Sequence, residues 1–391
     1  MSGASNTHRI IMRVLFLITK GDLGGAQRSV FLLSQGLKKE GYNICVGSGE
    51  KGYLTDKLGK SGINIAFFKN LKRTSNLFAN CFFVFELRKF LKKEKFEIIS
   101  FNSTNTLFGI LGLWGLKNKP KTVFTVHGSS FLSPGFKKSK ILKLFFLLTM
   151  KFLLPFVDKI VFVSEYDKKL AEKYKLVKND QGIVIYNGIE YIDFLNKEEA
   201  IKGLRKIKNF PNDKLIIGTI TRLEYAKGND ILIGSINKLP REILDKCIFL
   251  IIGDGPDREA LKLQITNYKL QNCIFLLGDI LEASKYLKAF DIFIMASRYE
   301  GMPYALLEAM VANLPIIASN VGGIPELLGD SGMMFEANNM DDFISNLTNL
   351  IKDRLLREEL SKKTSLQIKK FFFPEKLKEI KNLFISLGDS K

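Results

Sequence analysis

Short, unbroken apolar runs alternate with longer stretches of helical periodicity along most of this chain. In the first half the apolar runs lie at 13–19, 43–47, 63–68, 97–101, 121–126 and 159–164. Runs of this length are typical of strands that are buried on both faces, and most of the intervening segments are long enough to be helices. The pattern therefore predicts a parallel sheet that helices cover on both sides.

The same pattern restarts after a polar stretch at 191–214. Its apolar runs lie at 215–220, 247–253, 273–278, 291–297 and 315–319, and a helical segment follows from about residue 340. A chain of 391 residues is also too long for one ordinary core. We therefore expect an α/β protein with two doubly wound, Rossmann-like domains that face each other across a cleft. Ligands of such folds bind where the loops after the strands converge.

The expected domain boundaries follow from this restart. We place the first domain at 1–187, with a loose tail at 1–11, and the second domain at 188–370. The motif FFFPEK at 371–376 marks a break in the helical segment. We expect residues 371–391 to form a terminal helix that packs back toward the first domain.

Charge is distributed unequally between the two halves of the chain. Residues 1–180 contain 31 Lys and Arg against 12 Asp and Glu, whereas residues 181–391 contain 28 of each, so the net charge of +19 belongs to the first half. This asymmetry indicates a polyanionic partner, either nucleic acid or an anionic membrane, although a merely soluble basic surface is an alternative. The chain has no RNA-binding strand motif and no recognition-helix signature, so we expect no nucleic-acid partner.

Two stretches of the first half combine lysines with Leu and Phe, at 136–152 and 81–96. The run at 142–157 is interrupted by Lys143, Lys151 and Pro155 and is short for a membrane span. We interpret the first stretch as a helix that lies on an anionic leaflet, with a contribution from the second. The alternative, two buried helices with solvated lysines, remains open at this stage.

The chain's beginning and its cysteines and histidines favour a cytoplasmic location and no metal site. The start MSGASNTHRI lacks the apolar core of a signal peptide. The four cysteines have no C-x-x-C spacing, the chain has two histidines, and no Asp-x-Asp occurs. We therefore expect reduced thiols, no structural zinc and no other bound metal or cofactor.

Glycines and cations follow several of the predicted strands. Gly24 and Gly25 precede the first helix, whose free N–H groups suit an anion, although a diglycine is more often a plain turn. In TRLEYAKG, Arg222 and Lys227 are spaced to hold a diphosphate from two sides, although isolated cations are more often solvated. Turns at Gly253 and Gly278 are candidates for a nucleoside pocket, but strand-to-helix turns need glycine in any case.

The stretch SRYEGMPYALLE at 297–308 contains two carboxylates around a turn. Glu300 is expected in the loop, Pro303 at the first helical position, and Glu308 more than one turn into the helix. Carboxylates suit vicinal hydroxyls because they only accept hydrogen bonds, and the helix start suits a phosphate. A nucleotide-sugar needs both kinds of group, whereas two solvated surface glutamates are the plainer interpretation.

At this point the motifs resemble those of a known family, the retaining family 4 glycosyltransferases, which have the GT-B fold. The run E-G-M-P-x-x-x-x-E-A-M is similar to the E-x7-E motif of that family, and its Gly301, Met302 and Pro303 lie between the two glutamates. Other matches occur in the family's order, at G-G-A-Q-R, V-H-G, S-E, N-G-I, G-D-G-P and G-G-I-P-E. Where many relatives have Glu after G-G-A, this chain has Gln27.

The resemblance implies a role for each of these residues. Glu300 would hold hydroxyls of the donor sugar, Glu308 the ribose hydroxyls, and Arg222 with Lys227 the diphosphate leaving group. Gly25 and its neighbours would close over the phosphates from the first domain. His127 would lie near C6 of the sugar or near the acceptor. A retaining reaction is implied in the same way. The expectation of a reaction without a metal follows instead from Arg222, Lys227 and the helix N-termini as charge stabilisers, and from the missing Asp-x-Asp.

We therefore expect a glycosyltransferase that moves a sugar from a nucleotide-sugar, with UDP as the first expectation, to a glycan acceptor on a lipid. Bacterial polysaccharide or lipopolysaccharide synthesis at the inner face of the cytoplasmic membrane fits this chemistry. The alternatives are a nucleotide-sugar 2-epimerase of the same fold, a transferase with a soluble acceptor, and a family member without catalysis. The complete set of Glu300, Glu308, Arg222 and Lys227 argues against the last of these.

Overall fold

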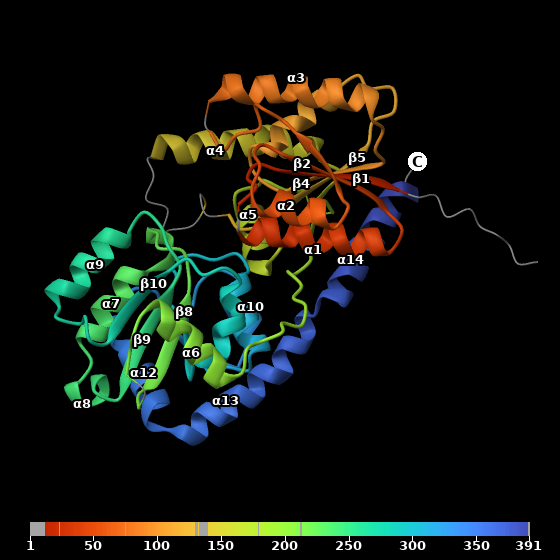
Figure 1. Ribbon diagram of the computed structural model, residues 1–391. Coiled ribbons are helices and arrows are strands. Elements are labelled where there is room, and N and C mark those ends of the chain that lie inside the picture. Colours follow the sequence, from red (N-terminus) through yellow and green to blue (C-terminus); the bar gives the residue numbers. More distant parts are fainter. Residues whose placement is uncertain are drawn as a thin grey trace, which may run out of the picture.

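The computed structural model describes residues 12–389, except 23, 75, 130, 131, 133–139, 179 and 212. The expected tail at 1–11 and residues 136–139 of the expected interfacial helix therefore lie outside the described residues. The chain forms two α/β units, each built on its own parallel sheet (Figure 1).

The first sheet has seven strands in the order β3-β2-β1-β4-β5-β6-β7, and each neighbouring pair is parallel. Its strands are β1 (Arg13–Ile18), β2 (Asn43–Ser48), β3 (Asn64–Phe67), β4 (Ile98–Phe101), β5 (Lys121–Val126), β6 (Lys159–Phe162) and β7 (Gly182–Val184). Helices α1 (Gly25–Lys39), α2 (Tyr53–Lys60), α3 (Leu77–Lys93), α4 (Lys140–Leu153) and α5 (Glu165–Lys173), with 3-10 turns at Thr106–Leu113 and Leu154–Phe156, connect them.

The second sheet has six strands in the order β10-β9-β8-β11-β12-β13, again parallel throughout. Its strands are β8 (Leu215–Ile220), β9 (Cys247–Ile252), β10 (Ile274–Gly278), β11 (Ile292–Met295), β12 (Ile316–Ser319) and β13 (Met333–Phe335). Its helices are α6 (Lys197–Ile207), α7 (Asn229–Asn237), α8 (Arg241–Leu244), α9 (Arg258–Asn267), α10 (Tyr304–Val311), α11 (Ile324–Leu328), α12 (Met340–Lys352) and α13 (Arg354–Gln367), with 3-10 turns at Tyr225–Lys227, Ala283–Ala289 and Ile368–Phe371.

These elements form where the apolar runs predicted them. All six residues of β9 and the last five of β1 are buried, as expected for strands covered on both faces. The strand order reverses between β1 and β4 in the first sheet and between β8 and β11 in the second. In doubly wound folds, loops diverge at such a reversal and leave a crevice for ligands. The predicted fold class is thus confirmed.

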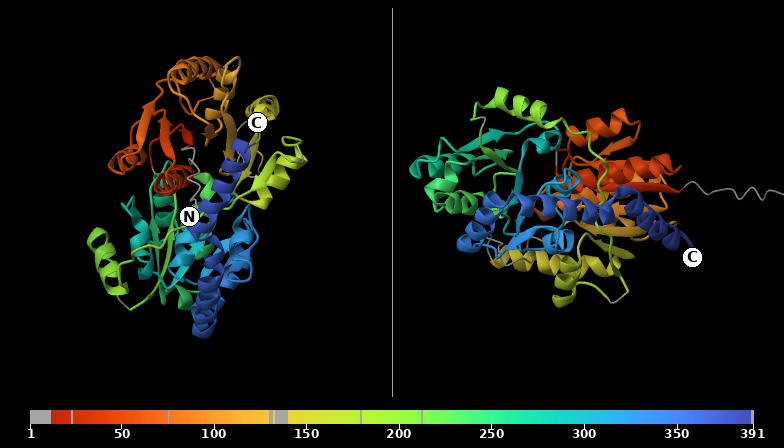
Figure 2. Two further views of the ribbon diagram at one scale, coloured as in Figure 1. Left: turned by 90° about the vertical axis from the view of Figure 1, so that its right-hand side faces the viewer. Right: turned by 90° about the horizontal axis from the view of Figure 1, so that it is seen from below.

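The last helix joins the two units. Helix α14 (Phe373–Asp389) leaves the second unit and lies along α1, where Phe373 and Leu377 approach Gly36 closely. An ion pair of 2.5 Å links Lys381 of α14 to Glu40 at the end of α1. Figures 1 and 2 show the blue terminal helices running from one unit to the other.

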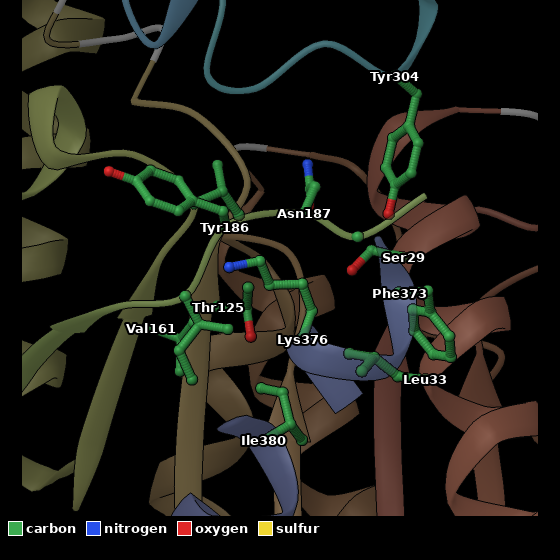
Figure 3. Close-up of a pocket in the computed structure, with 13 residues that line it drawn as sticks. Ser29, Leu33, Thr125, Val161, Tyr186, Asn187, Tyr304, Phe373, Lys376 and Ile380 are labelled. Atoms are coloured by element: carbon green, nitrogen blue, oxygen red, sulfur yellow. The ribbon is translucent and has the colours of Figure 1, made fainter. Parts of the chain in front are cut away.

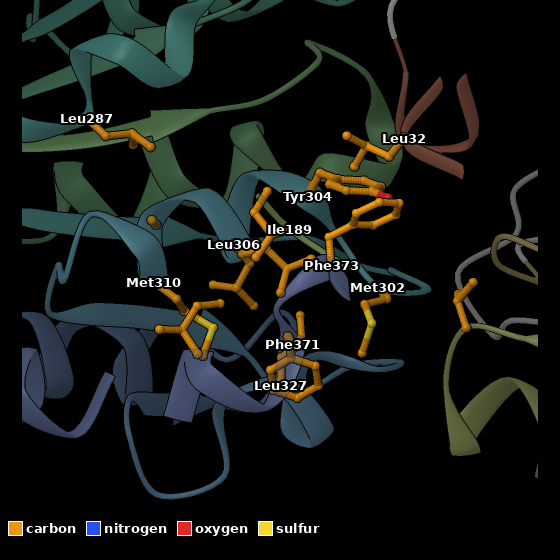
Figure 4. Close-up of a cluster of buried hydrophobic side chains, with 14 of the residues drawn as sticks. Leu32, Ile189, Leu287, Met302, Tyr304, Leu306, Met310, Leu327, Phe371 and Phe373 are labelled. Atoms are coloured by element: carbon orange, nitrogen blue, oxygen red, sulfur yellow. The ribbon is translucent and has the colours of Figure 1, made fainter. Parts of the chain in front are cut away.

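A continuous apolar cluster extends from one unit into the other. It contains Leu32 of α1, Ile189 of the connection, Leu306 of α10 and Phe373 of α14 (Figure 4). Burial of apolar side chains contributes about 1.5–3 kcal/mol for each large residue. Burial of apolar side chains therefore holds the two units together in addition to the polar contacts between them.

Helices α3 and α4 leave apolar side chains uncovered on the outside of the first unit. The exposed residues are Leu77, Phe78, Phe82 and Phe85 of α3 and Ile141, Leu144, Leu148 and Phe152 of α4. In α4 the buried residues are Met150 and Leu153, so the interpretation of α4 as an ordinary buried helix is wrong. No described helix combines the length and the hydropathy that crossing a bilayer requires.

Candidate active site between the two domains

Glu300 lies in the loop between β11 and α10, where two partners from its own domain hold it. Lys227 Nζ lies 2.8 and 2.9 Å from the two carboxylate oxygens of Glu300. Ser297 donates its hydroxyl to the same carboxylate at 2.6 Å. The Glu300 side chain is 8% exposed, so the interpretation as a solvated surface glutamate is wrong. The structure thus brings together two residues that lie 73 positions apart in the sequence.

Local structure explains how Lys227 reaches Glu300. The short 3-10 turn at Tyr225–Lys227 ends at Gly228, whose φ of +65° suits glycine. A Cβ at Gly228 would stand 1.9 Å from the carbonyl oxygen of Ala296 at the end of β11. The turn therefore packs directly against the strand that precedes Glu300, which places the lysine over the carboxylate.

Arg222 keeps the expected position after β8 but has a different partner. Its Nε lies 3.5 Å from Glu224, and its side chain is 52% exposed. The backbone carbonyl of Arg222 accepts a hydrogen bond from Asn229 at the start of α7. Lys227 and Glu300 therefore form an ion pair already in the ligand-free protein. Arg222, which precedes Lys227 in the same loop, is half-exposed and does not pair with Glu300.

Glu308 lies in the second turn of α10, and its partner comes from the other domain. Arg28 of α1 forms an ion pair with the Glu308 carboxylate. The guanidinium also lies 5.0 Å from the ring centroid of Tyr304, one turn earlier in α10. The Glu308 side chain is 9% exposed. The Glu308 carboxylate is buried like that of Glu300, but its ion pair forms only when the two domains are placed as they are here.

Tyr304 connects the same two helices. Its ring lies 3.6 Å from the position that a Cβ on Gly25 would take, at the start of α1. Burial raises the pKa of Tyr304 to about 12, while a hydrogen bond with Ser29 and the charge of Arg28 lower it. Figure 3 shows the Tyr304 hydroxyl directed toward Ser29, beside a cavity of about 30 Å³. The start of α1 is thus fitted against α10.

The expected glycines and Pro303 lie at the ends of strands or at the starts of helices. Gly24 precedes α1, and no side chain among the described residues caps the helix start, which leaves N–H groups there for a ligand. Pro303 stands one residue before α10 rather than at its first position, which is a minor correction. Gly253 follows β9 and donates its N–H to the carbonyl of Gly278 at 2.8 Å. Gly24, Pro303 and Gly253 lie after strands, as the sequence predicted, whereas Gly278 is the last residue of β10.

His127 and its loop form the first-domain side of the junction. Its Nε2 lies 3.2 Å from Asn102 Oδ1, whereas its buried Nδ1 has no hydrogen-bond partner among the described residues. Burial lowers the pKa of His127 to about 4, so the imidazole is neutral at pH 7. A Cβ on Gly301 would stand 2.7 Å from the His127 carbonyl oxygen, so the two domains touch at this backbone contact.

Three further polar contacts cross between the domains. Glu326 of α11 accepts the backbone N–H groups of Glu165 and Tyr166 at the start of α5, at 2.7 Å each. Tyr299 donates its hydroxyl to Asp167 at 2.8 Å, and burial raises the pKa of that carboxyl. All three contacts join the second domain to the start of α5 in the first domain.

A further contact involves the N-G-I motif and the loop of the first glutamate. Asn187 donates its side-chain amide to the Met302 carbonyl at 3.0 Å, and its backbone N–H points at the Met302 sulfur at 3.1 Å. Met302 is therefore placed by the first domain, and so is the loop that begins α10.

A larger cavity of about 590 Å³ opens in the first domain at the carboxyl ends of β1, β4 and β5. Lys20, Arg73, Asn105 and His127 are among its polar lining residues. Its apolar lining includes Leu142, Phe146 and Met150 of α4, with Leu154, Phe162, Ala171 and Leu176, and also Ile18, Phe124, Val126 and Leu132. The cavity thus has a mixed lining, in which the part formed by α4 is apolar.

Comparisons with known proteins agree with this arrangement. The family model described as "Glycosyltransferase Family 4" matches residues 23–191, and the model described as "Glycosyl transferases group 1" matches residues 201–367. An Escherichia coli protein, "UDP-Gal:alpha-D-GlcNAc-diphosphoundecaprenol alpha-1,3-galactosyltransferase", is 30% identical over 382 residues, which cover 94% of this chain and 95% of the relative. The chain belongs to the family 4 glycosyltransferases.

Other relatives of this glycosyltransferase point the same way. The Escherichia coli "O-antigen biosynthesis glycosyltransferase WbnH" is 30% identical over 339 residues, 86% of this chain and 90% of the relative. The crystal structure of Anabaena Alr3699/HepE in complex with UDP-glucose superposes with a TM-score of 0.79 at 19% identity, over 96% of this chain and 100% of that one. That likeness shows the shared fold, and the expected GT-B architecture is confirmed.

Sequence reasoning about this glycosyltransferase missed most residues that act across the domains. Arg28 and Glu326 were visible as parts of the motifs G-G-A-Q-R and G-G-I-P-E, but nothing in the sequence indicated their partners. Tyr304 and Asp167 carried no signal beyond their position near a motif. The spacing of hydrophobic residues predicts helices and strands, and motifs predict functional loops. The pairs between domains depend instead on how one domain is placed against the other.

Proposed function

We propose that this glycosyltransferase moves a sugar from a UDP-sugar to a lipid-linked glycan acceptor, with retention at the anomeric carbon and without a divalent metal. The pair of Lys227 and Glu300 supports this proposal most strongly, because the two charges meet at 2.8 Å beside the start of α10. A cation for the departing diphosphate and a carboxylate for sugar hydroxyls are thereby present at one place in the interdomain site.

The reaction separates these two charges from each other. Hydroxyls of the donor sugar replace Lys227 on the Glu300 carboxylate, and the diphosphate takes the ammonium group. As the bond to the anomeric carbon breaks, negative charge grows on the diphosphate and meets Lys227, Arg222 and the free N–H groups of α1. The acceptor hydroxyl attacks from the face that the diphosphate leaves, and its proton passes to a departing phosphate oxygen.

UDP is proposed as the nucleotide because of the Escherichia coli relative, whose name specifies UDP-Gal. That name also specifies an acceptor, a GlcNAc carried on diphosphoundecaprenol. The polarity of the 590 Å³ cavity suits such an amphiphile. Its hydroxyl and amide side chains would receive the sugar, Lys20 and Arg73 the phosphates, and the apolar lining formed by α4 the first part of the chain.

We further propose that α3 and α4 rest on the anionic inner face of the cytoplasmic membrane. Their exposed Phe, Leu and Ile side chains form an apolar surface, and Lys89, Lys92, Lys93, Lys140 and Lys151 on the same helices are exposed. A surface of this composition matches a leaflet of anionic lipids, since it combines apolar burial with electrostatic attraction. The acceptor cavity lies directly beneath α4, so a lipid-borne acceptor has a short path to it.

The transfer is tested by incubating the pure protein with a panel of nucleotide-sugars and a short-chain prenyl-diphosphate GlcNAc in the presence of EDTA. We expect UDP release that requires the acceptor, and a product whose anomeric configuration by NMR equals that of the donor. Release of UDP without acceptor, an inverted product or complete loss of activity with EDTA would each contradict the corresponding part of the proposal.

The membrane contact is tested by flotation with anionic and neutral vesicles. Ile141→Ser removes a side chain that is 82% exposed on α4, and Leu355→Ser removes a matched one, 76% exposed, on α13 of the other domain. We expect the first change to weaken binding to anionic vesicles about tenfold, the effect of one buried aliphatic side chain, and the second to leave it unchanged. Equal effects of both changes, or equal binding to both kinds of vesicle, would refute the contact.

A further inference from the structure

Arg28 contacts Glu308, the carboxylate that the resemblance to family 4 glycosyltransferases implies for the ribose hydroxyls. The Arg28 guanidinium comes from α1 of the first domain and pairs with Glu308 of α10 in the second. The Glu308 side chain is buried, at 9% exposure, whereas the Arg28 side chain is half-buried, at 31%. A ribose with two hydroxyls donates hydrogen bonds to a carboxylate, as the guanidinium does. The two groups therefore compete for the Glu308 carboxylate, on which Arg28 contacts Oε1.

The surroundings of Arg28 make its partner important. Burial lowers the pKa of the guanidinium, while the charges of Glu190, Tyr304 and Tyr53 raise it. An arginine nevertheless stays charged at pH 7, and a half-buried charge is stabilised by a partner. When ribose displaces Arg28 from Glu308, the guanidinium therefore gains from any further anion that the ligand places beside it.

A bound nucleoside diphosphate brings that anion with it. Arg28 lies in the first turn of α1, and the backbone N–H of Arg28 bonds the Gly24 carbonyl at 2.9 Å. The glycine loop and the free N–H groups of this turn are the part of the first domain proposed to meet the diphosphate. A nucleoside without phosphates would displace Arg28 and offer no replacement.

We propose that Arg28 is a specificity residue, which Glu308 holds in the empty site and which moves to the diphosphate when ribose takes Glu308. The inference rests on the proposed function, since it assumes a nucleoside diphosphate donor. Its consequence is selectivity for the complete nucleotide. Arg28 opposes the binding of a nucleoside alone and favours the binding of its diphosphate.

The experiment compares uridine with UDP, and guanosine with GDP, by calorimetry on the full chain. Arg28→Gln keeps a polar side chain of similar length and removes the charge. We expect it to bind uridine about tenfold more tightly and UDP about tenfold more weakly, each the size of one charge-assisted hydrogen bond. Arg28→Lys should retain most of the preference for UDP, because it keeps the charge.

A matched control is available in Lys381→Ala, which removes an ion pair between α14 and α1 outside the cleft and should change neither affinity. Equal loss of both affinities in Arg28→Gln would show a structural role and overturn the inference, and so would unchanged affinities. If the unchanged protein binds none of the four ligands, the proposed function falls together with the inference.

A crystal structure of the unchanged protein with UDP gives a second test that does not depend on the folding of a variant. We expect Arg28 within 3.5 Å of a phosphate oxygen, a normal hydrogen-bond reach, and the ribose hydroxyls on Glu308. A complex in which Arg28 still pairs with Glu308 would overturn the inference while leaving the proposed function intact.

Discussion

The two glutamates around the start of α10 are buried alike but are held differently. Glu300 takes both partners, Lys227 and Ser297, from its own domain, whereas Glu308 takes Arg28 from the other domain. The first carboxylate is therefore positioned by a rigid strand and turn, and the second by the contact between domains. This difference suits the tasks expected of them, since Glu300 would contact the reacting sugar and Glu308 the ribose, which takes no part in the reaction.

The largest expected effect is that of changing Glu300. Glu300→Gln should lower kcat at least a hundredfold, because an interaction with the reacting sugar acts in the transition state. Steady-state kinetics measure it, with Glu259→Gln, 79% exposed on α9, as the control. A change confined to KM would contradict the assignment.

The next effect tests the other glutamate. Glu308→Gln should raise KM for the donor about tenfold and leave kcat within about threefold, because a ribose contact contributes equally to ground and transition states. Steady-state kinetics measure both constants. The melting temperature of the variant shows whether the loss of the Arg28 partner destabilises the fold. If kcat fell as far as in Glu300→Gln, the proposed difference between the two residues would be refuted.

A smaller effect concerns the placement of the domains. Glu326→Ala removes two charge-assisted hydrogen bonds at the start of α5, which are worth about 1.5–3 kcal/mol each at most. We expect kcat/KM to fall about tenfold and the scattering radius of the ligand-free protein to increase. An unchanged radius with unchanged kcat/KM would show that the apolar cluster and α14 alone set the domain arrangement.

The least direct prediction concerns pH and the buried His127. Its pKa of about 4 in the folded protein lies below the ordinary value of about 6.5, so below pH 6.5 the unfolded chain binds a proton that the folded protein does not. Stability is therefore complete above pH 6.5 and falls as the pH drops toward 4, by about 2 kcal/mol at pH 5. Denaturant unfolding at pH 7.5 and 5.0 measures this loss.

The matching variant for that measurement is His127→Asn, which removes the titrating group. The loss of stability between pH 7.5 and 5.0 should be about 2 kcal/mol smaller in the variant than in the unchanged protein. An identical loss in both proteins would mean that His127 titrates normally and is not enclosed as described.

The sequence predicted what depends on neighbours in the chain. Apolar runs located β1 and β9 because both faces of these strands are buried. The three-residue edge strands β7 and β13 were missed, since Gly182–Val184 and Met333–Phe335 are too short to form a pattern. The loop of Glu300 was located for the same reason as β9, because it directly follows a buried strand.

What the sequence could not show depends on residues far apart along the chain. Arg28 and Glu308 are 280 positions apart, and Glu326 and Glu165 are 161 apart. These pairs lie between two domains that the apolar cluster and α14 also join. No local period or motif spacing contains that information, so the partners of Glu308 appeared only in three dimensions.

The central claim is that Lys227 absorbs the charge left on the diphosphate when the sugar departs. The most direct measurement is the turnover of Lys227→Ala with its best UDP-sugar and acceptor, beside Lys262→Ala, 49% exposed on α9. We predict a fall of a hundredfold or more for the first, the scale of a lost charge stabiliser, and no change for the second. Near-normal turnover of Lys227→Ala would contradict the account.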